Sequence, residues 1–153
     1  MSHIKTKIIV SNKSDSENNS KINEQADQVI NEFLAELEAL QIAWDLKFNG
    51  QPFRCRRCGN DDFWQYKSNL EIRKCKQCYL QTRLRKGTLF EHSKVPMRDW
   101  MRAIEYYLNH GSRSRVRGLM RHLGNISYPK AWALLMKIRA EKNMLAEFFS
   151  KDN

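Results

Sequence analysis

The sequence lacks any long run of apolar residues. The apolar stretch in "MSHIKTKIIV" has three residues and falls far short of the apolar core of a signal peptide. Nothing later approaches the roughly 20 apolar residues that a membrane-spanning helix needs. These absences argue against secretion and membrane insertion, so we expect a cytoplasmic protein. In that compartment, paired cysteines serve metal binding or redox chemistry more often than disulfides.

Acidic side chains are scarce in the C-terminal two thirds of the chain. Residues 51–153 carry 22 basic and 9 acidic side chains, whereas residues 1–50 carry 5 basic and 8 acidic ones. The formal net charge of +10 therefore arises wholly from the second segment. Such a concentration favours a polyanionic partner, either nucleic acid or an anionic membrane surface.

Composition divides the chain into four regions and reveals no long internal repeat. Residues 1–21 include "SNKSDSENNS", which has no apolar side chain to offset the entropy of ordering, and we expect a disordered tail. Residues 22–47 have apolar residues at spacings of three and four, which predicts an amphipathic helix. It packs against the rest of the chain or contacts a second copy or a partner protein. We expect strands around the cysteines at 53–86 and helices at 95–149, and hence an α+β fold.

Local patterns locate the elements within these regions. Three segments rich in aromatic and β-branched residues, "FWQYK", "EIRKC" and "YLQTRL", predict three short antiparallel strands. Pro96 and Gly111 bracket a predicted helix, and Gly124 ends a second one. Ser127 at an N-cap and Pro129 just inside predict the start of a third helix.

All four cysteines lie in two Cys-x-x-Cys pairs. They are Cys55, Cys58, Cys75 and Cys78. The pattern C-x2-C-x16-C-x2-C is within the spacing of a four-thiolate zinc site. Each pair forms a tight knuckle, so four sulfurs can reach one tetrahedral ion at about 2.3 Å. Gly59 suits the turn after the first pair, whereas Tyr79 stands at the matching place in the second. We therefore expect one structural Zn²⁺ in a zinc ribbon.

Catalytic interpretations of the cysteines fit less well. A thioredoxin-like motif needs one Cys-x-x-Cys at a helix start in a βαβ context, which neither pair has. A catalytic zinc ion keeps one position open for water, whereas four thiolates close the coordination shell. Iron remains open, because sequence does not separate iron from zinc at four sulfurs.

The second functional pattern is a helix, a turn containing Gly124 and another helix, in "RVRGLMRHLGNISYPKAWALLMKIRAEK". This is the layout of a helix-turn-helix, whose second helix enters the DNA major groove by its N-terminal residues. Basic residues gather there and around the first knuckle. The candidate DNA-contacting residues are Arg56, Arg57, Arg113, Arg115, Arg117, Arg121, Tyr128, Lys130 and Lys137.

Over about residues 53–143 the order of these parts resembles the N-terminal half of bacterial insertion-sequence transposases of the ISXO group. Those proteins follow a four-cysteine ribbon with a "GT-[ILV]-F…[LV]-P…W" segment and a helix-turn-helix ending in "TAW…L…KIR". The matching positions here are Gly87, Thr88, Phe90, Pro96, Trp100, Leu123, Gly124, Ser127, Ala131, Trp132, Leu135, Ile138 and Arg139. The turn "LGNIS" is one residue longer than the usual form, and residues 1–50 match nothing in that family.

The resemblance implies binding of double-stranded DNA, such as a transposon end or a derived site, at the bacterial nucleoid. Such transposases continue into a nuclease domain whose acidic residues hold two metal ions. The acids of residues 53–143 here show no spacing for such a cluster, so we expect no enzymatic activity. The chain is then a decayed transposase, a domesticated regulator or one part of a split transposase. A zinc-ribbon adapter that binds protein and an iron electron carrier remain the alternatives.

Overall fold

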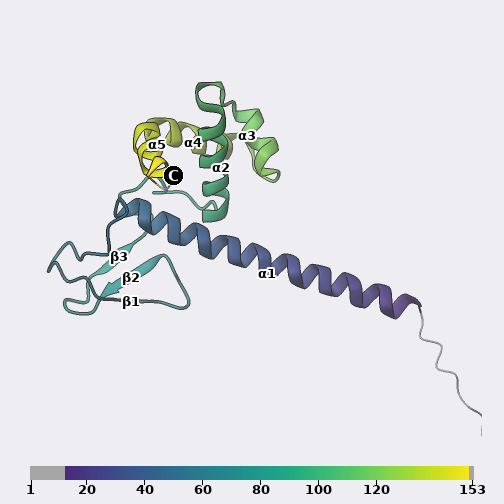
Figure 1. Ribbon diagram of the computed structural model, residues 1–153, viewed down its shortest axis with the longest axis horizontal. Coiled ribbons are helices and arrows are strands. Elements are labelled where there is room, and N and C mark those ends of the chain that lie inside the picture. The colour runs from purple at the N-terminus through teal and green to yellow at the C-terminus, as the bar shows by residue number, and fades with distance from the viewer. Residues whose placement is uncertain (1–12, 152–153) are drawn as a thin grey trace, which may run out of the picture. The chain divides into compact units, whose positions relative to one another are not determined.

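The computed structural model describes residues 13–151 and has an α+β architecture, as predicted (Figure 1). Among these residues, five α-helices, one short 3-10 helix and a three-stranded sheet follow one another along the chain. The described residues fall into two compact units, the first ending at Ala35 and the second beginning at Glu36. No helix in the described part of the chain has both the length and the apolar character that a membrane crossing requires.

Helix α1 extends from Lys13 to Lys47 and crosses the boundary between the two units. Residues 13–21, which the polar composition assigns to a disordered tail, are helical here, and residues 1–12 of that tail lie outside the described residues. Extending an existing helix adds one hydrogen bond for each residue fixed and needs no new nucleus. Polar residues can therefore continue α1 without a packing partner.

The apolar stripe of α1 meets different surroundings at its two ends. Between residues 39 and 46, the side chains of Leu40 and Trp44 are buried in the core of the second unit. In the first unit, Val29 and Phe33 are 66% and 61% exposed. The expected packing of this helix against the rest of the chain is therefore seen for residues 39–46.

Three short antiparallel strands form a sheet in the order β1-β2-β3, as the sequence predicts. The strands are β1 (Phe63–Gln65), β2 (Ile72–Cys75) and β3 (Gln81–Arg83). Trp64 lies opposite Lys74, which lies opposite Gln81. Successive side chains of a strand point to opposite faces, so these three residues share one face. Arg73 and Cys75 point to the other face, and both are buried.

Four helices follow the sheet. They are α2 (Met97–His110), α3 (Val116–Leu123), α4 (Tyr128–Ala140) and α5 (Lys142–Ser150), with a 3-10 turn at Gly111–Arg113. Helices α2, α3 and α4 each contact the other two, and α5 contacts α4 (Figure 1). Gly111 and Gly124 follow α2 and α3 with φ of 54° and 86°, a region that favours glycine. The predicted ends of these helices are therefore confirmed.

The hydrophobic core of the second unit joins the end of α1 to helices α2–α5. Its largest fully buried side chains include Trp44, Leu84, Phe90, Met97, Trp100, Ile104, Leu119, Leu135, Ile138 and Leu145. A smaller cluster of Phe53, Cys55 and Cys75 lies with the sheet. This second cluster is too small to support the cysteine-bearing segment by apolar burial alone, because domains with little core depend on metals or disulfides.

Trp44 joins the helical core to the sheet. Its Nε1 donates a hydrogen bond to the carbonyl of Leu70, at 3.0 Å, in the loop before β2. The guanidinium of Arg73 lies 4.2 Å from the centre of the Trp44 ring and 4.4 Å from that of Phe63. Burial lowers the pKa of Arg73, and Asp45 acts in the opposite direction. An arginine stays charged at neutral pH, so a desolvated cation is held between two aromatic rings.

Glu36 caps the start of helix α2. Its carboxylate accepts hydrogen bonds from the backbone N–H groups of Met97 and Arg98, at 2.9 and 2.8 Å. Pro96, at the N-cap position, supplies no side-chain cap. A carboxylate at this place satisfies two free amides and complements the positive end of the helix dipole. The contact is nonlocal, so Glu36 fixes how α1 lies against the start of α2.

Replacing Glu36 tests this cap. Glu36→Ala should lower the free energy of unfolding by about 1–2 kcal/mol, the usual effect of losing a helix cap. Glu36→Gln keeps one acceptor oxygen and should lose less. The measurement is urea unfolding followed by circular dichroism, with Glu38→Ala as the control because Glu38 is exposed on the same helix. Equal stabilities of Glu36→Ala and Glu38→Ala would contradict the cap.

Candidate metal centre and nucleic-acid interface

The two Cys-x-x-Cys pairs form knuckles that fold alike. The N–H of Gly59 donates to the carbonyl of Cys55 at 2.9 Å, and the N–H of Tyr79 donates to the carbonyl of Cys75 at 3.1 Å. In each knuckle the amide of the first cysteine donates in turn to the carbonyl five residues later. Both turns close at a residue with positive φ, 75° at Gly59 and 61° at Tyr79. The second knuckle therefore adopts a glycine-like turn without a glycine.

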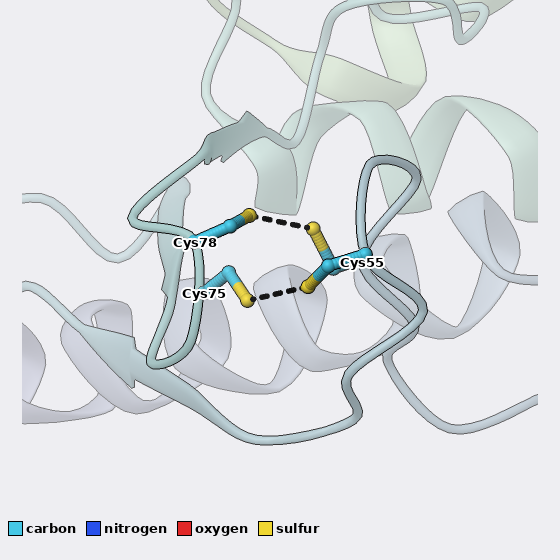
Figure 2. Close-up of side chains that lie close together, drawn as sticks. Cys55, Cys75 and Cys78 are labelled. Carbon is cyan, nitrogen blue, oxygen red and sulfur yellow. Dashed lines mark hydrogen bonds between the residues drawn. The ribbon is translucent and has the colours of Figure 1, made fainter.

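The knuckles bring all four sulfurs together, as predicted. The Sγ atoms of Cys55 and Cys78 are 3.5 Å apart, and so are those of Cys58 and Cys75. All four Sγ atoms lie within 4.8 Å of one another. Figure 2 shows the side chains of the labelled residues Cys55, Cys75 and Cys78 converging from two facing loops. A tetrahedral ion with bonds of about 2.3 Å needs sulfurs about 3.8 Å apart, so the four cysteines fit one metal ion.

Backbone hydrogen bonds, desolvation and the neighbouring thiols shift the pKa values of three of the cysteines. Amide hydrogen bonds from Cys78 and Gln77 outweigh desolvation and lower the pKa of Cys75 to about 6. Amide hydrogen bonds within the first knuckle likewise lower the pKa of Cys55. At Cys58, an amide bond from Asn60 lowers the pKa, but desolvation and the neighbouring thiols outweigh it and raise the pKa to about 12. Four sulfurs this close cannot all carry charge without a cation among them.

The second candidate site lies on helices α3 and α4. Arg117, Met120, Arg121 and Tyr128 line a hollow between the exposed side of α3 and the start of α4. The side chains of both arginines and of Tyr128 are exposed. Two cations and one aromatic ring are therefore presented together at the N-terminus of α4.

Two other arginines hold this helix pair in place. Arg102 of α2 donates hydrogen bonds to the carbonyls of His122 and Leu123, which end α3. Arg139 of α4 donates to the carbonyl of Ser114, which lies just before α3 and is buried. These bonds satisfy main-chain acceptors that would otherwise lack partners, so both guanidinium groups act in the fold.

The nine predicted DNA-contacting residues differ in exposure and do not all lie on one surface. Eight of them have exposed side chains, and Arg117, Arg121 and Tyr128 lie around one hollow. Lys137 is only partly exposed, and its ammonium donates to the carbonyl of Glu91. Lys130 is exposed but borders a cavity of about 400 Å³ beside residues 92–96. The lysine flank of α4 therefore faces the loop before α2, unlike the open flank that carries Tyr128.

Sequence reasoning missed a cationic pocket that folding assembles from distant segments. Its basic lining residues are Lys47, Arg54, Arg56, Arg83 and Lys86, and its volume is about 210 Å³. The ammonium of Lys47 donates to the carbonyl of Lys86. Burial, and then repulsion from Arg56, lowers the pKa of Lys47, with Glu91 acting in the opposite direction. The sequence signal that could have indicated this site is the cluster of basic residues near the first knuckle.

Comparisons with protein-family models, with curated proteins and with solved structures give no match. The functional assignment therefore rests on the residues and the geometry of the chain itself. Among the described residues, the four cysteines form the one group of three or more Cys, His, Asp or Glu side chains close enough to share a metal ion.

Removing one sulfur tests the metal centre. Cys75→Ser should lower the metal content from about one ion per chain to well below that, because a buried hydroxyl replaces a thiolate ligand. The ribbon should then lose its structure, since its apolar cluster is small. Metal content is measured by mass spectrometry and folding by circular dichroism. Gln77→Ser is the control in the same knuckle. A Cys75→Ser protein with full metal content and unchanged folding would contradict the assignment.

Proposed function

We propose that this chain is a binding protein for double-stranded DNA, related to the ISXO-group transposases, and that it has no catalytic activity of its own. The observation that carries this proposal is the hollow between α3 and α4, where Arg117, Arg121 and Tyr128 are presented together. In this proposal α3 and α4 are a helix-turn-helix and α4 is the recognition helix. DNA phosphates supply the negative charge that the hollow lacks.

The packing of the helices supports this proposal. Helix α2 contacts both α3 and α4, so a three-helix core fixes the angle of the pair. Ser127 is at the N-cap position of α4 without a side-chain cap bond, Pro129 lies in the first turn, and Tyr128 of that turn is 51% exposed. A recognition helix reads base edges with its N-terminal residues while the preceding helix contacts the backbone. Tyr128 is then the base-proximal residue, and Arg117 and Arg121 of α3 contact phosphates.

The four-cysteine centre has a structural role in this proposal, and zinc is the metal it holds. Four thiolates complete a tetrahedral shell and leave no position for water or substrate. One Zn²⁺ and four thiolates carry a net charge of −2, which leaves the surrounding region strongly basic. The metal fixes the first knuckle, which includes Arg56 and Arg57, and both of these side chains are exposed. An iron centre of the same geometry would give a coloured protein, whereas a zinc centre gives a colourless one.

The distribution of charge is consistent with a polyanionic partner such as DNA. Residues 51–153 hold the whole positive excess, and their acids are few. Four of those acids already pair with Lys or Arg side chains: Asp62 with Lys76, Glu71 with Arg85, Asp99 with Arg102 and Glu147 with Lys151. Chromosomal DNA would place the protein at the bacterial nucleoid. The binding site would be a transposon end or a sequence derived from one.

A second candidate function is contact with another copy of the chain through residues 22–34. Ile22, Ala26, Val29 and Phe33 recur at spacings of four, three and four, the seam pattern of a two-stranded coiled coil. Ile22, Val29 and Phe33 are each at least 60% exposed. Residues 1–50 carry more acids than bases, so this segment is unsuited to DNA. Pairing would bring two DNA-binding units to one site.

Truncating both α3 arginines tests DNA binding. Arg117→Ala combined with Arg121→Ala should weaken binding to duplex DNA and reduce the slope of log affinity against log salt by about 1.8, since each phosphate contact contributes about 0.9. The measurement is fluorescence anisotropy of a labelled duplex at several salt concentrations. The control is Lys142→Ala with Lys151→Ala, at the start of α5 and just beyond its end, which removes the same charge elsewhere. An unchanged slope in the arginine variant would contradict the proposal.

Introducing charge into the apolar seam tests self-association. Val29→Glu combined with Phe33→Glu should convert a dimer to a monomer, because buried carboxylates at seam positions are costly. Sedimentation of the purified protein measures the mass. Asn31→Glu, on a different side of the helix, is the control and should stay dimeric. A wild-type protein that sediments as a monomer would rule out pairing through this seam.

A further inference from the structure

The outer face of the ribbon sheet carries an exposed aromatic pair. The rings of Trp64 and Tyr79 stack nearly parallel, with centroids 5.9 Å apart and planes 12° apart. Trp64 is 47% exposed and Tyr79 is 61% exposed. The Nζ of Lys74 lies 5.1 Å from the Tyr79 ring centre. Aromatic side chains are usually buried in a core, but here a flat stacked pair is exposed to solvent beside a cation.

Tyr79 occupies its position at a cost to the backbone. Its φ of 61° is in the left-handed region, where a side chain other than glycine costs about 1–2 kcal/mol. The first knuckle has Gly59 at the matching position. A glycine would thus relieve strain at residue 79, yet the chain has a large aromatic residue there. Strained residues concentrate at functional sites, because binding can require a side chain that folding disfavours.

The aromatic face borders the cationic pocket. Gln81 links the two, since its side chain donates to the hydroxyl of Tyr66 at 3.2 Å and also lines the pocket. Arg83, two residues further along β3, projects from the same face as Gln81 and lines the pocket as well. The pocket also has Arg54 in its lining, and no acidic residue takes part. An aromatic platform and a cationic pocket without acidic residues are therefore connected through Gln81 across the outer face of the sheet.

We propose that this surface binds single-stranded DNA, with unpaired bases stacked on Trp64 and Tyr79 and backbone phosphates in the cationic pocket. Stacking platforms beside basic grooves bind single strands with little sequence preference, since every base has a flat face. A duplex does not offer this contact, because its base faces already stack on one another. The surface is therefore separate from the duplex-binding hollow on α3 and α4.

Removing the ring of Tyr79, whose backbone is strained, gives the sharpest test. Tyr79→Gly should weaken binding of the zinc-loaded protein to a labelled oligo(dT) by about tenfold. It should leave the stability toward urea equal to or above that of the wild type, because glycine is unstrained at this φ. Trp64→Ala should weaken oligo(dT) binding similarly, and Trp64→Phe, which keeps a flat ring, should retain most of it. Trp132→Ala removes a half-exposed aromatic ring from α4 and is the matched control.

The pocket is tested by salt dependence, and the duplex proposal by a separate variant. Arg54→Ala with Arg83→Ala should reduce the salt slope for oligo(dT) by about 1.4, at about 0.7 per phosphate on a single strand. Arg117→Ala with Arg121→Ala should keep oligo(dT) binding even if duplex affinity is lost. Wild-type oligo(dT) affinity in both Tyr79→Gly and Trp64→Ala would overturn the proposal. So would a less stable Tyr79→Gly protein, because the ring would then serve the fold.

Discussion

The contact between Trp44 and Arg73 is the constraint on which the second unit depends. Trp44 is almost fully buried, lies in the packed part of α1, and binds the loop before β2 through its indole N–H. Arg73 covers its ring from the sheet side and touches Phe63 on its other face. The Nε of Arg73 has no hydrogen-bond partner among the described residues, so the rings themselves stabilise the cation. Phe48 packs against both the helical core and the cluster beside the sheet, so the Trp44–Arg73 contact lies at the junction of the two.

The residues buried on the inner face of the sheet determine which side chains lie on its outer face. A strand alternates its side chains, so placing Arg73 and Cys75 inward places Lys74 outward. Trp64 then faces outward opposite Lys74, and Gln81 lies beyond it. The aromatic and cationic character of the outer face therefore follows from the register that the Trp44 contact and the sulfur cluster impose. A shift by one residue would bury Lys74 and expose Arg73.

Local patterns predicted the helix ends, the strands and the sulfur cluster, because each depends on residues near one another in sequence. Gly111 and Gly124 specify turns directly, and the cysteine spacing specifies a common centre. Long-range contacts were not predictable in this way. The binding of Glu36 to the start of α2 joins residues about 60 positions apart, and no local pattern marks it. Residues 13–21 were predicted to be disordered because their polar side chains offer nothing to bury. Extending an existing helix needs no buried surface, so α1 can continue through them.

The net positive charge overstates the number of cations that are free to bind a partner, because several of them stabilise the fold. Arg85 forms a bidentate pair with Glu71 and donates to the carbonyls of Ser93 and Val95. Arg73, Arg102, Arg139 and Lys137 likewise have contacts within the protein. A guanidinium that satisfies buried carbonyls cannot leave them for a phosphate without exposing unpaired acceptors. Exposed cations outside these contacts include those on the first knuckle, along β3 and on α3. In both proposed DNA complexes, these cations would bind phosphates while exposed aromatic rings contact bases.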